Sequence, residues 1–183
     1  MFTENKIAKI GLLLFLSTEV MFFAGLLSAY WVLRAQLPIW PPVGQPRFPV
    51  GVTGVNTLIL LASAVTFFQA ERSLQHDSKR PWVAWLVITL VGGCLFLVVQ
   101  GYEWVRLLHF GLTTVRNVYG SLFYVVVGMH AVHVLTALIV VAVVLSRSEN
   151  YTSEHHTGVT LGRIYWTFVV LVWPVIYLLL YVI

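Results

Sequence analysis

Five long apolar stretches determine the fold class of this chain. They cover residues 10–33, 50–70, 82–102, 118–146 and 164–183, and Glu19 is the only Asp, Glu, Lys or Arg within them. Crossing the hydrocarbon core of a bilayer takes roughly 20 helical residues, so each stretch is long enough to span it. Because lipid offers no partners for backbone N–H and C=O groups, each stretch is expected to be a helix. The sequence therefore predicts an all-α integral membrane protein in which residues 1–183 form a single transmembrane domain, a bundle of five helices.

The composition excludes several other classes of protein. Hydrophobic residues make up 59% of the chain and charged residues 10%, whereas soluble domains have roughly half and a quarter. A soluble enzyme, a disordered regulator and a secreted disulfide scaffold are excluded. The net charge of +4 comes without a basic run, so no nucleic-acid partner is expected. Cys94, the only cysteine, lies within an apolar stretch and is expected to be a small buried hydrophobe.

The distribution of lysine and arginine predicts the orientation of the bundle. If the N-terminus is cytoplasmic, seven of the eleven cations lie in cytoplasmic segments and four, namely Arg34, Arg47, Arg106 and Arg116, lie outside. Cytoplasmic loops carry an excess of Lys and Arg. We therefore expect a cytoplasmic N-terminus and a periplasmic C-terminus.

Titratable side chains at membrane depth are costly, so each one is a candidate functional residue. Glu19 has only apolar side chains one helical turn away. It is either a proton-linked or interface carboxyl, or a neutral, hydrogen-bonded packing residue. His130 and His133 share one face of the fourth predicted helix. They could hold a metal or provide a haem ligand, but hydrogen bonding to a neighbouring helix is the more common role.

Gln100 and Glu103 lie on nearly the same face at the end of the third predicted span. With His130 and His133 they form a candidate intramembrane polar network. A zinc site takes three or four protein ligands, and a bis-imidazole haem needs histidines from two facing helices. We therefore expect no catalytic residue, no metal and no cofactor-binding site in this chain. A stand-alone proton or ion conductor, or a haem-binding membrane anchor, is an alternative.

Five segments along the chain form recognisable motifs, namely residues 17–25 (STEVMFFAG), 56–63 (NTLILLAS), 100–104 (QGYEW), 119–134 (YGSLFYVVVGMHAVHV) and 165–173 (YWTFVVLVW). In sequence and in order, these segments resemble the motifs of subunit III of haem–copper terminal oxidases. Two features depart from the family. Thr167 and Val170 stand where the last motif has His and Asp, and the chain has five spans where longer members have seven. Its first span is similar to the third span of those members.

The resemblance implies a non-redox accessory subunit of a cytochrome c or quinol oxidase in a bacterial inner membrane. The implied partners are the catalytic haem–copper subunit I and the copper-binding subunit II, or their quinol-oxidase equivalents, which would carry the haems and copper. The resemblance further implies bound structural phospholipid and support of proton uptake and of the catalytic subunit. Glu19 matches the family's buried, carbodiimide-reactive carboxyl. The alternative is a related five-span protein that accompanies nitric oxide reductases.

Overall fold

The computed structural model describes residues 2–36, 38–39, 48–111 and 118–183, and in these ranges all regular secondary structure is helical. The elements are α1 (Phe2–Gln36), α2 (Val50–Gln75), α3 (Lys79–His109), α4 (Val118–Ser146), the 3₁₀ turn η1 (Ser148–Asn150), α5 (Thr157–Tyr177) and its π-helical continuation η2 (Leu178–Val182). Within these described ranges, five helices are long and apolar enough to cross a membrane. This confirms the predicted all-α, five-helix architecture. Arg47 and Arg116, which enter the orientation argument, lie outside the described residues.

Four of the helices extend beyond their apolar stretches. α1 begins at Phe2, α5 begins at Thr157, α2 continues to Gln75 and α3 continues to His109. The added turns carry charged side chains such as Lys9 and Arg106. Hydropathy marks the part of a helix that lipid can surround, whereas the helix itself ends where its backbone hydrogen bonds end.

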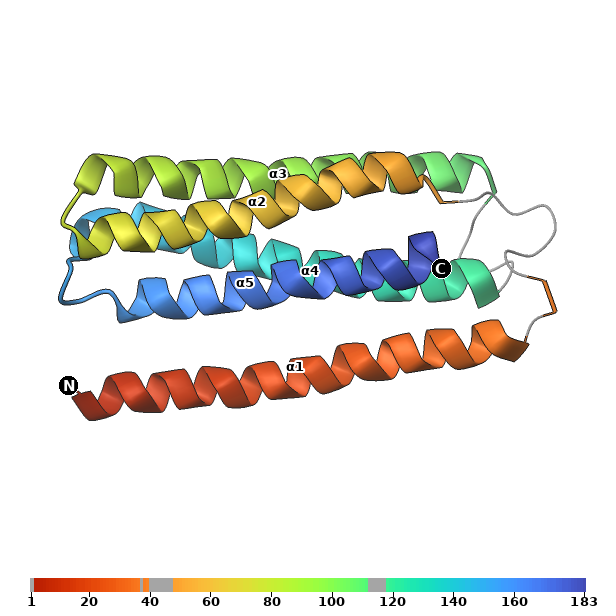
Figure 1. Ribbon diagram of the computed structural model, residues 1–183, viewed down its shortest axis with the longest axis horizontal. Helices are drawn as coiled ribbons and strands as arrows, with labels where there is room; N and C mark the ends of the chain where they lie inside the picture. Colours follow the sequence, from red (N-terminus) through yellow and green to blue (C-terminus); the bar gives the residue numbers. More distant parts are fainter. Residues whose placement is uncertain (1, 37, 40–47, 112–117) are drawn as a thin grey trace.

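Neighbouring helices of α2–α5 run antiparallel and pack side by side, with α1 along the outside of the bundle against α4 and α5 (Figure 1). Residues 76–78 connect α2 to α3 in a tight turn, in which Asp77 adopts a positive φ of 53°. The N-terminus, this turn and the α4–α5 connection lie at one end of the bundle. We refer to it as the N-terminal end, and the C-terminus lies at the opposite, C-terminal end.

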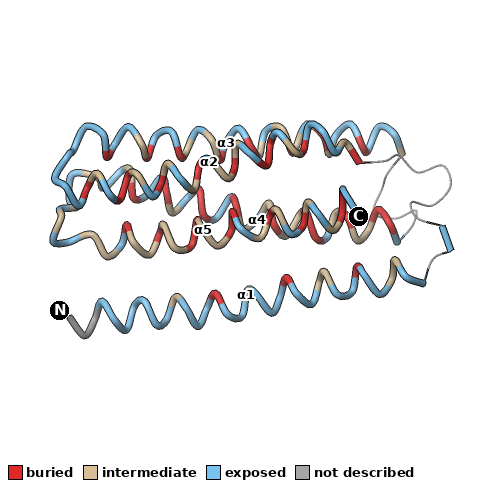
Figure 2. Tube along the Cα trace, viewed as in Figure 1, coloured by how far each residue is buried: buried red, intermediate tan, exposed pale blue. Residues whose placement is uncertain are grey.

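The core lies among α2–α5 and is rich in large aromatic side chains. Phe67, Phe96, Trp166 and Trp173 are each at most 1% exposed. Gly93 of α3 allows the close packing, because a Cβ atom there would lie 2.5 Å from Cη2 of Trp166. Figure 2 shows the buried positions of these four helices gathered on the sides that they turn toward one another.

α1 packs along a single narrow seam. Only 11% of its most apolar 18-residue window is buried, against 28–39% for the other four helices, and Figure 2 shows α1 mostly exposed. Its buried side chains, Leu16, Phe23 and Tyr30, recur every seven residues, and Glu19 and Leu26 between them are half-buried. This alternating spacing of three and four is that of a coiled-coil seam. Glu19 therefore occupies an internal position of the seam.

Cys94 is exposed on the outward face of α3, so the prediction that it is buried was wrong. Its neighbours Val91, Leu95 and Val98 are exposed as well. Lipid tails are as apolar as leucine side chains, so the outward face of a membrane helix need not be more polar than the inward face. An apolar sequence context therefore places a residue in the membrane without indicating which face it occupies.

Candidate functional site

The seam between α1 and α4 contains a carboxyl–imidazole contact at membrane depth. Oε2 of Glu19 lies 2.7 Å from Nε2 of His133, and the two side chains are only 16% and 12% exposed. Nδ1 of His133 lies 2.7 Å from the carbonyl oxygen of Met129, one turn earlier in α4. Because a carbonyl oxygen can only accept, Nδ1 carries a proton and donates it to this hydrogen bond.

This assignment leaves two arrangements for the remaining proton between Glu19 and His133. With Nδ1 protonated, the contact between Nε2 and Oε2 needs one proton, which either atom can hold. The pair is then a carboxylic acid facing a neutral imidazole, or a carboxylate facing an imidazolium. Both arrangements are neutral overall, which suits membrane depth, where an isolated charge is strongly disfavoured.

His130 shares the α4 face with His133 but has different surroundings. It is 1% exposed, and its ring stacks on Trp173 of α5 with centroids 4.9 Å apart and planes 27° from parallel. Phe96 of α3 approaches the ring edge-on at 6.2 Å. Phe23 of α1 lies edge-on to His130 at 6.3 Å and to His133 at 5.1 Å. Aromatic packing around His130 thus brings four helices together.

Gln100 and Glu103 belong to a second polar group, nearer the C-terminal end. Nε2 of Gln100 donates to the hydroxyl of Tyr181 at 2.9 Å. Glu103 accepts a hydrogen bond from Nη1 of Arg106, also at 2.9 Å. Both Gln100 and Glu103 are buried, with 3% and 4% exposed. Glu103 and its partner Arg106 are three residues apart, whereas Gln100 and its partner Tyr181 are 81 residues apart.

Trp173 lies between the two polar groups. Besides stacking on His130, its ring centroid is 6.3 Å from that of Tyr181, and its Nε1 donates to Oγ1 of Thr57 at 2.9 Å. The four residues grouped by sequence as one polar network are therefore divided between two groups, with Trp173 packed against both.

A buried ion pair at the N-terminal end was not predicted from the sequence. Glu71 of α2 is 5% exposed, accepts a hydrogen bond from Oγ1 of Thr160 at 2.5 Å and pairs with Nε of Arg163. Thr160 and Arg163 belong to the first turns of α5. Glu71 and Arg163 border the apolar stretches, where charges normally face headgroups and water. The sequence feature that could have indicated this pair is the spacing of Thr160 and Arg163, which places both side chains on one helix face.

In the part of the chain that the structure describes, no three His, Cys, Asp or Glu side chains are grouped so that they could hold a metal ion. His130 and His133 both come from α4, whereas a bis-imidazole haem needs two facing helices. Both ring nitrogens of His133 are also engaged, one by Glu19 and one by the backbone. These residues do not form a ligand set for a redox centre.

The fold and the site together define a multi-pass membrane protein whose buried polar side chains connect its own helices. The family model of cytochrome c oxidase subunit III matches residues 2–183. The chain is 37% identical over 174 residues to cytochrome c oxidase subunit 3 of Synechocystis sp., covering 93% of this chain and 73% of that protein. The corresponding protein of Thermostichus vulcanus is 37% identical over 176 residues, covering 94% and 86%. That of Aedes aegypti is 35% identical over 182 residues, covering 93% and 67%.

The chain belongs to the cytochrome c oxidase subunit III family. It is an accessory subunit of a haem–copper oxidase and thus part of an oxidoreductase complex with other oxidase subunits. The family membership confirms the resemblance drawn from the five sequence motifs.

Proposed function

We propose that this chain stabilises the catalytic subunit of its oxidase and supports proton uptake, without carrying a redox centre of its own. In this proposal the haems and copper reside in the catalytic haem–copper subunit I and a copper-binding subunit II, or in their quinol-oxidase equivalents. The complex lies in a bacterial inner membrane with the N-terminus of this chain in the cytoplasm. Structural phospholipid accompanies it.

The contact between Glu19 and His133 is the observation that carries this proposal. The two side chains bond to each other across the seam, and Phe22 and Phe23 lie against the imidazole with ring centroids 6.2 Å and 5.1 Å away. A neutral pair enclosed by aromatic rings suits a subunit that holds its helices and a partner in register. It suits a stand-alone ion conductor or a haem anchor less well.

Affinity purification of the tagged chain from native membranes in mild detergent tests the proposal. We expect haem-containing partners, a reduced-minus-oxidised haem spectrum and oxygen uptake. Nitric oxide uptake without oxygen uptake would support the nitric oxide reductase alternative instead. A colourless chain that purifies alone and moves protons after reconstitution would contradict the proposal.

A second experiment tests the supporting role directly. The oxidase is prepared with and without this chain, and the number of turnovers completed before inactivation is compared. We expect the depleted enzyme to inactivate sooner and to recover when the purified chain is added back. Equal lifetimes would contradict the supporting role while leaving family membership unaffected.

Glu19 gives a matched chemical test within the assembled complex. Glu19→Gln is expected to leave assembly intact, because an amide can still hydrogen-bond to His133. The same substitution is expected to abolish labelling by a hydrophobic carbodiimide, which requires a carboxyl group. Labelling that survives in the variant would place the reactive carboxyl elsewhere.

A further inference from the structure

A polar pocket of about 430 Å³ opens at the N-terminal end, between the first turns of α1, the last turns of α2 and the start of α5. It is distinct from the Glu19–His133 contact and from the group around Gln100. The residues that determine its charge are Lys9, Glu71, Arg72, His76, His156 and Arg163.

The residues that line the pocket carry a surplus of positive charge. Three cations and one carboxylate line it, so the surplus is two with both histidines neutral. Glu71 is already engaged by Thr160 and Arg163 and is 5% exposed. Lys9 and Arg72, in contrast, are exposed. The two exposed cations therefore present their charge to whatever enters the pocket.

The depth of the pocket indicates the kind of anion that reaches it. Its residues lie where the second and fifth apolar stretches border charged sequence, at the level of lipid headgroups. Phe68, half exposed, lines the same pocket, and the Arg163 guanidinium lies 5.7 Å from its ring. A ligand there meets both cationic side chains and an aromatic ring. Basic pockets between transmembrane helices on the cytoplasmic side bind phosphate-bearing lipid headgroups.

We propose that this pocket binds the phosphate of an anionic phospholipid such as phosphatidylglycerol, with Lys9 and Arg72 as the recognising cations. Glu71 and Arg163 form the floor of the site and hold α2 against α5. This inference rests on the proposed function, which places this end of the bundle in the cytoplasm and includes bound phospholipid. It adds the binding residues and the class of headgroup.

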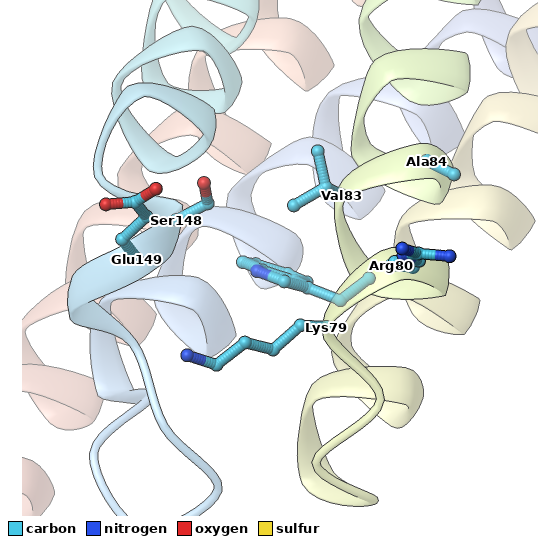
Figure 3. Close-up of a pocket in the computed structure, with 7 residues that line it drawn as sticks. Lys79, Arg80, Val83, Ala84, Ser148 and Glu149 are labelled. Atoms are coloured by element: carbon cyan, nitrogen blue, oxygen red, sulfur yellow. The ribbon is translucent and has the colours of Figure 1, made fainter.

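A second pocket at the same end provides a matched control. It measures about 550 Å³ and is lined by Lys79, Arg80 and Glu149 among others. Figure 3 shows that Lys79 extends from α3 toward the side of Glu149, whereas the guanidinium of Arg80 lies over the α3 ribbon and away from it. Its cations diverge and a carboxylate faces the space, so it lacks the concentrated charge of the first pocket. Removing two cations here changes the net charge equally.

The test uses the chain purified with its accompanying subunits, delipidated in detergent and exposed to vesicles of phosphatidylcholine containing phosphatidylglycerol. Bound lipid is counted by native mass spectrometry for the wild type, Lys9→Gln/Arg72→Gln and Lys79→Gln/Arg80→Gln. We expect the wild type to retain phosphatidylglycerol in preference to phosphatidylcholine. Each cation near a membrane surface contributes about fivefold to the binding of anionic lipid, so the first double variant should lose about twenty-five-fold.

Three outcomes would overturn the proposal. The first is an equal loss in both double variants, which would indicate general surface charge. The second is the absence of any preference for phosphatidylglycerol in the wild type. The third is displacement of the lipid by millimolar inorganic phosphate, which would assign the site to a soluble phosphate. Subunit composition and oxygen uptake, recorded on the same preparations, report separately on the proposed function.

Discussion

α1 and the bundle α2–α5 are equally suited to lipid but differ in how much of their surface packs against other helices. The bundle encloses Trp166 and Trp173 completely, and Gly93 brings its helices into close contact. α1 touches its neighbours along one seam, and most of its apolar surface remains exposed. A helix that buries so little can keep its position only through specific contacts.

The polar contacts of the two regions differ correspondingly. In the bundle, the ion pair of Glu71 and Arg163 connects α2 to α5 next to the headgroup region. In the seam, Glu19 and His133 make a contact that is neutral overall at membrane depth. A polar residue inside a coiled-coil seam specifies register at some cost in stability. Polar residues therefore reinforce the packing of the bundle, whereas in α1 they define which turn of the helix meets α4.

The largest expected effect tests the ion pair of the bundle. Arg163→Gln leaves the buried carboxylate of Glu71 without its cation, and removing one partner of a buried pair costs about 3 kcal/mol or more. Thermal unfolding in detergent should show a strongly lowered stability. The double variant Glu71→Gln/Arg163→Gln removes both charges and should recover much of the loss. A double variant as unstable as the single one would show that the charge pair is not what matters.

A pair of glycine substitutions tests the difference in packing. Gly93→Ala places a methyl group against Trp166 and should cost about 2 kcal/mol, as overpacking of a core does. Gly25→Ala on α1 meets nothing within 4 Å, and alanine favours the helix by up to about 1 kcal/mol. Unfolding of the two variants in the same detergent gives the comparison. Equal destabilisation would mean that α1 is packed as closely as the bundle.

The seam is tested by removing the hydrogen bond at Glu19. Glu19→Ala leaves Nε2 of His133 without its partner at a cost of about 1 kcal/mol, whereas Glu19→Gln retains a donor. Hydrogen exchange should accelerate in α1 for the alanine variant and stay unchanged in α2–α5. Glu19→Gln serves as the matched control. If exchange rose throughout the chain, Glu19 would be stabilising the whole bundle and not the position of α1.

The smallest effect concerns the outward face of the bundle. Cys94→Ala should change stability by less than about 0.5 kcal/mol, because Cys94 is exposed. The thiol of the folded chain in detergent should react with a lipid-soluble maleimide, because detergent and no protein covers it. A thiol that reacts only after unfolding would place Cys94 inside the bundle. Protection that appears only in the assembled oxidase would show that a partner covers this face of α3.

Sequence reasoning was most successful where a single physical constraint applied. Long apolar stretches have to be helices in lipid, so five helices followed directly. Glu19 and His133 were singled out separately because titratable groups at that depth are costly, but their contact joins positions 114 residues apart. Nothing in either local sequence indicates the other. Glu71 and Arg163 were missed because charges at the ends of membrane spans usually face headgroups and water, and burial between two helices is decided by packing.

The amino-acid sequence by itself determined that this protein lies in a lipid bilayer and that it has five helices, because transfer of apolar residues into lipid depends on composition and length. Its motifs also determined its family. The tertiary structure alone decided which faces meet. It turned Cys94 outward, stacked His130 on Trp173 and brought His133 to Glu19. The physical reason is that both faces of a membrane helix are apolar, so hydrophobicity cannot distinguish them. Shape complementarity and a few hydrogen bonds between distant residues make that choice.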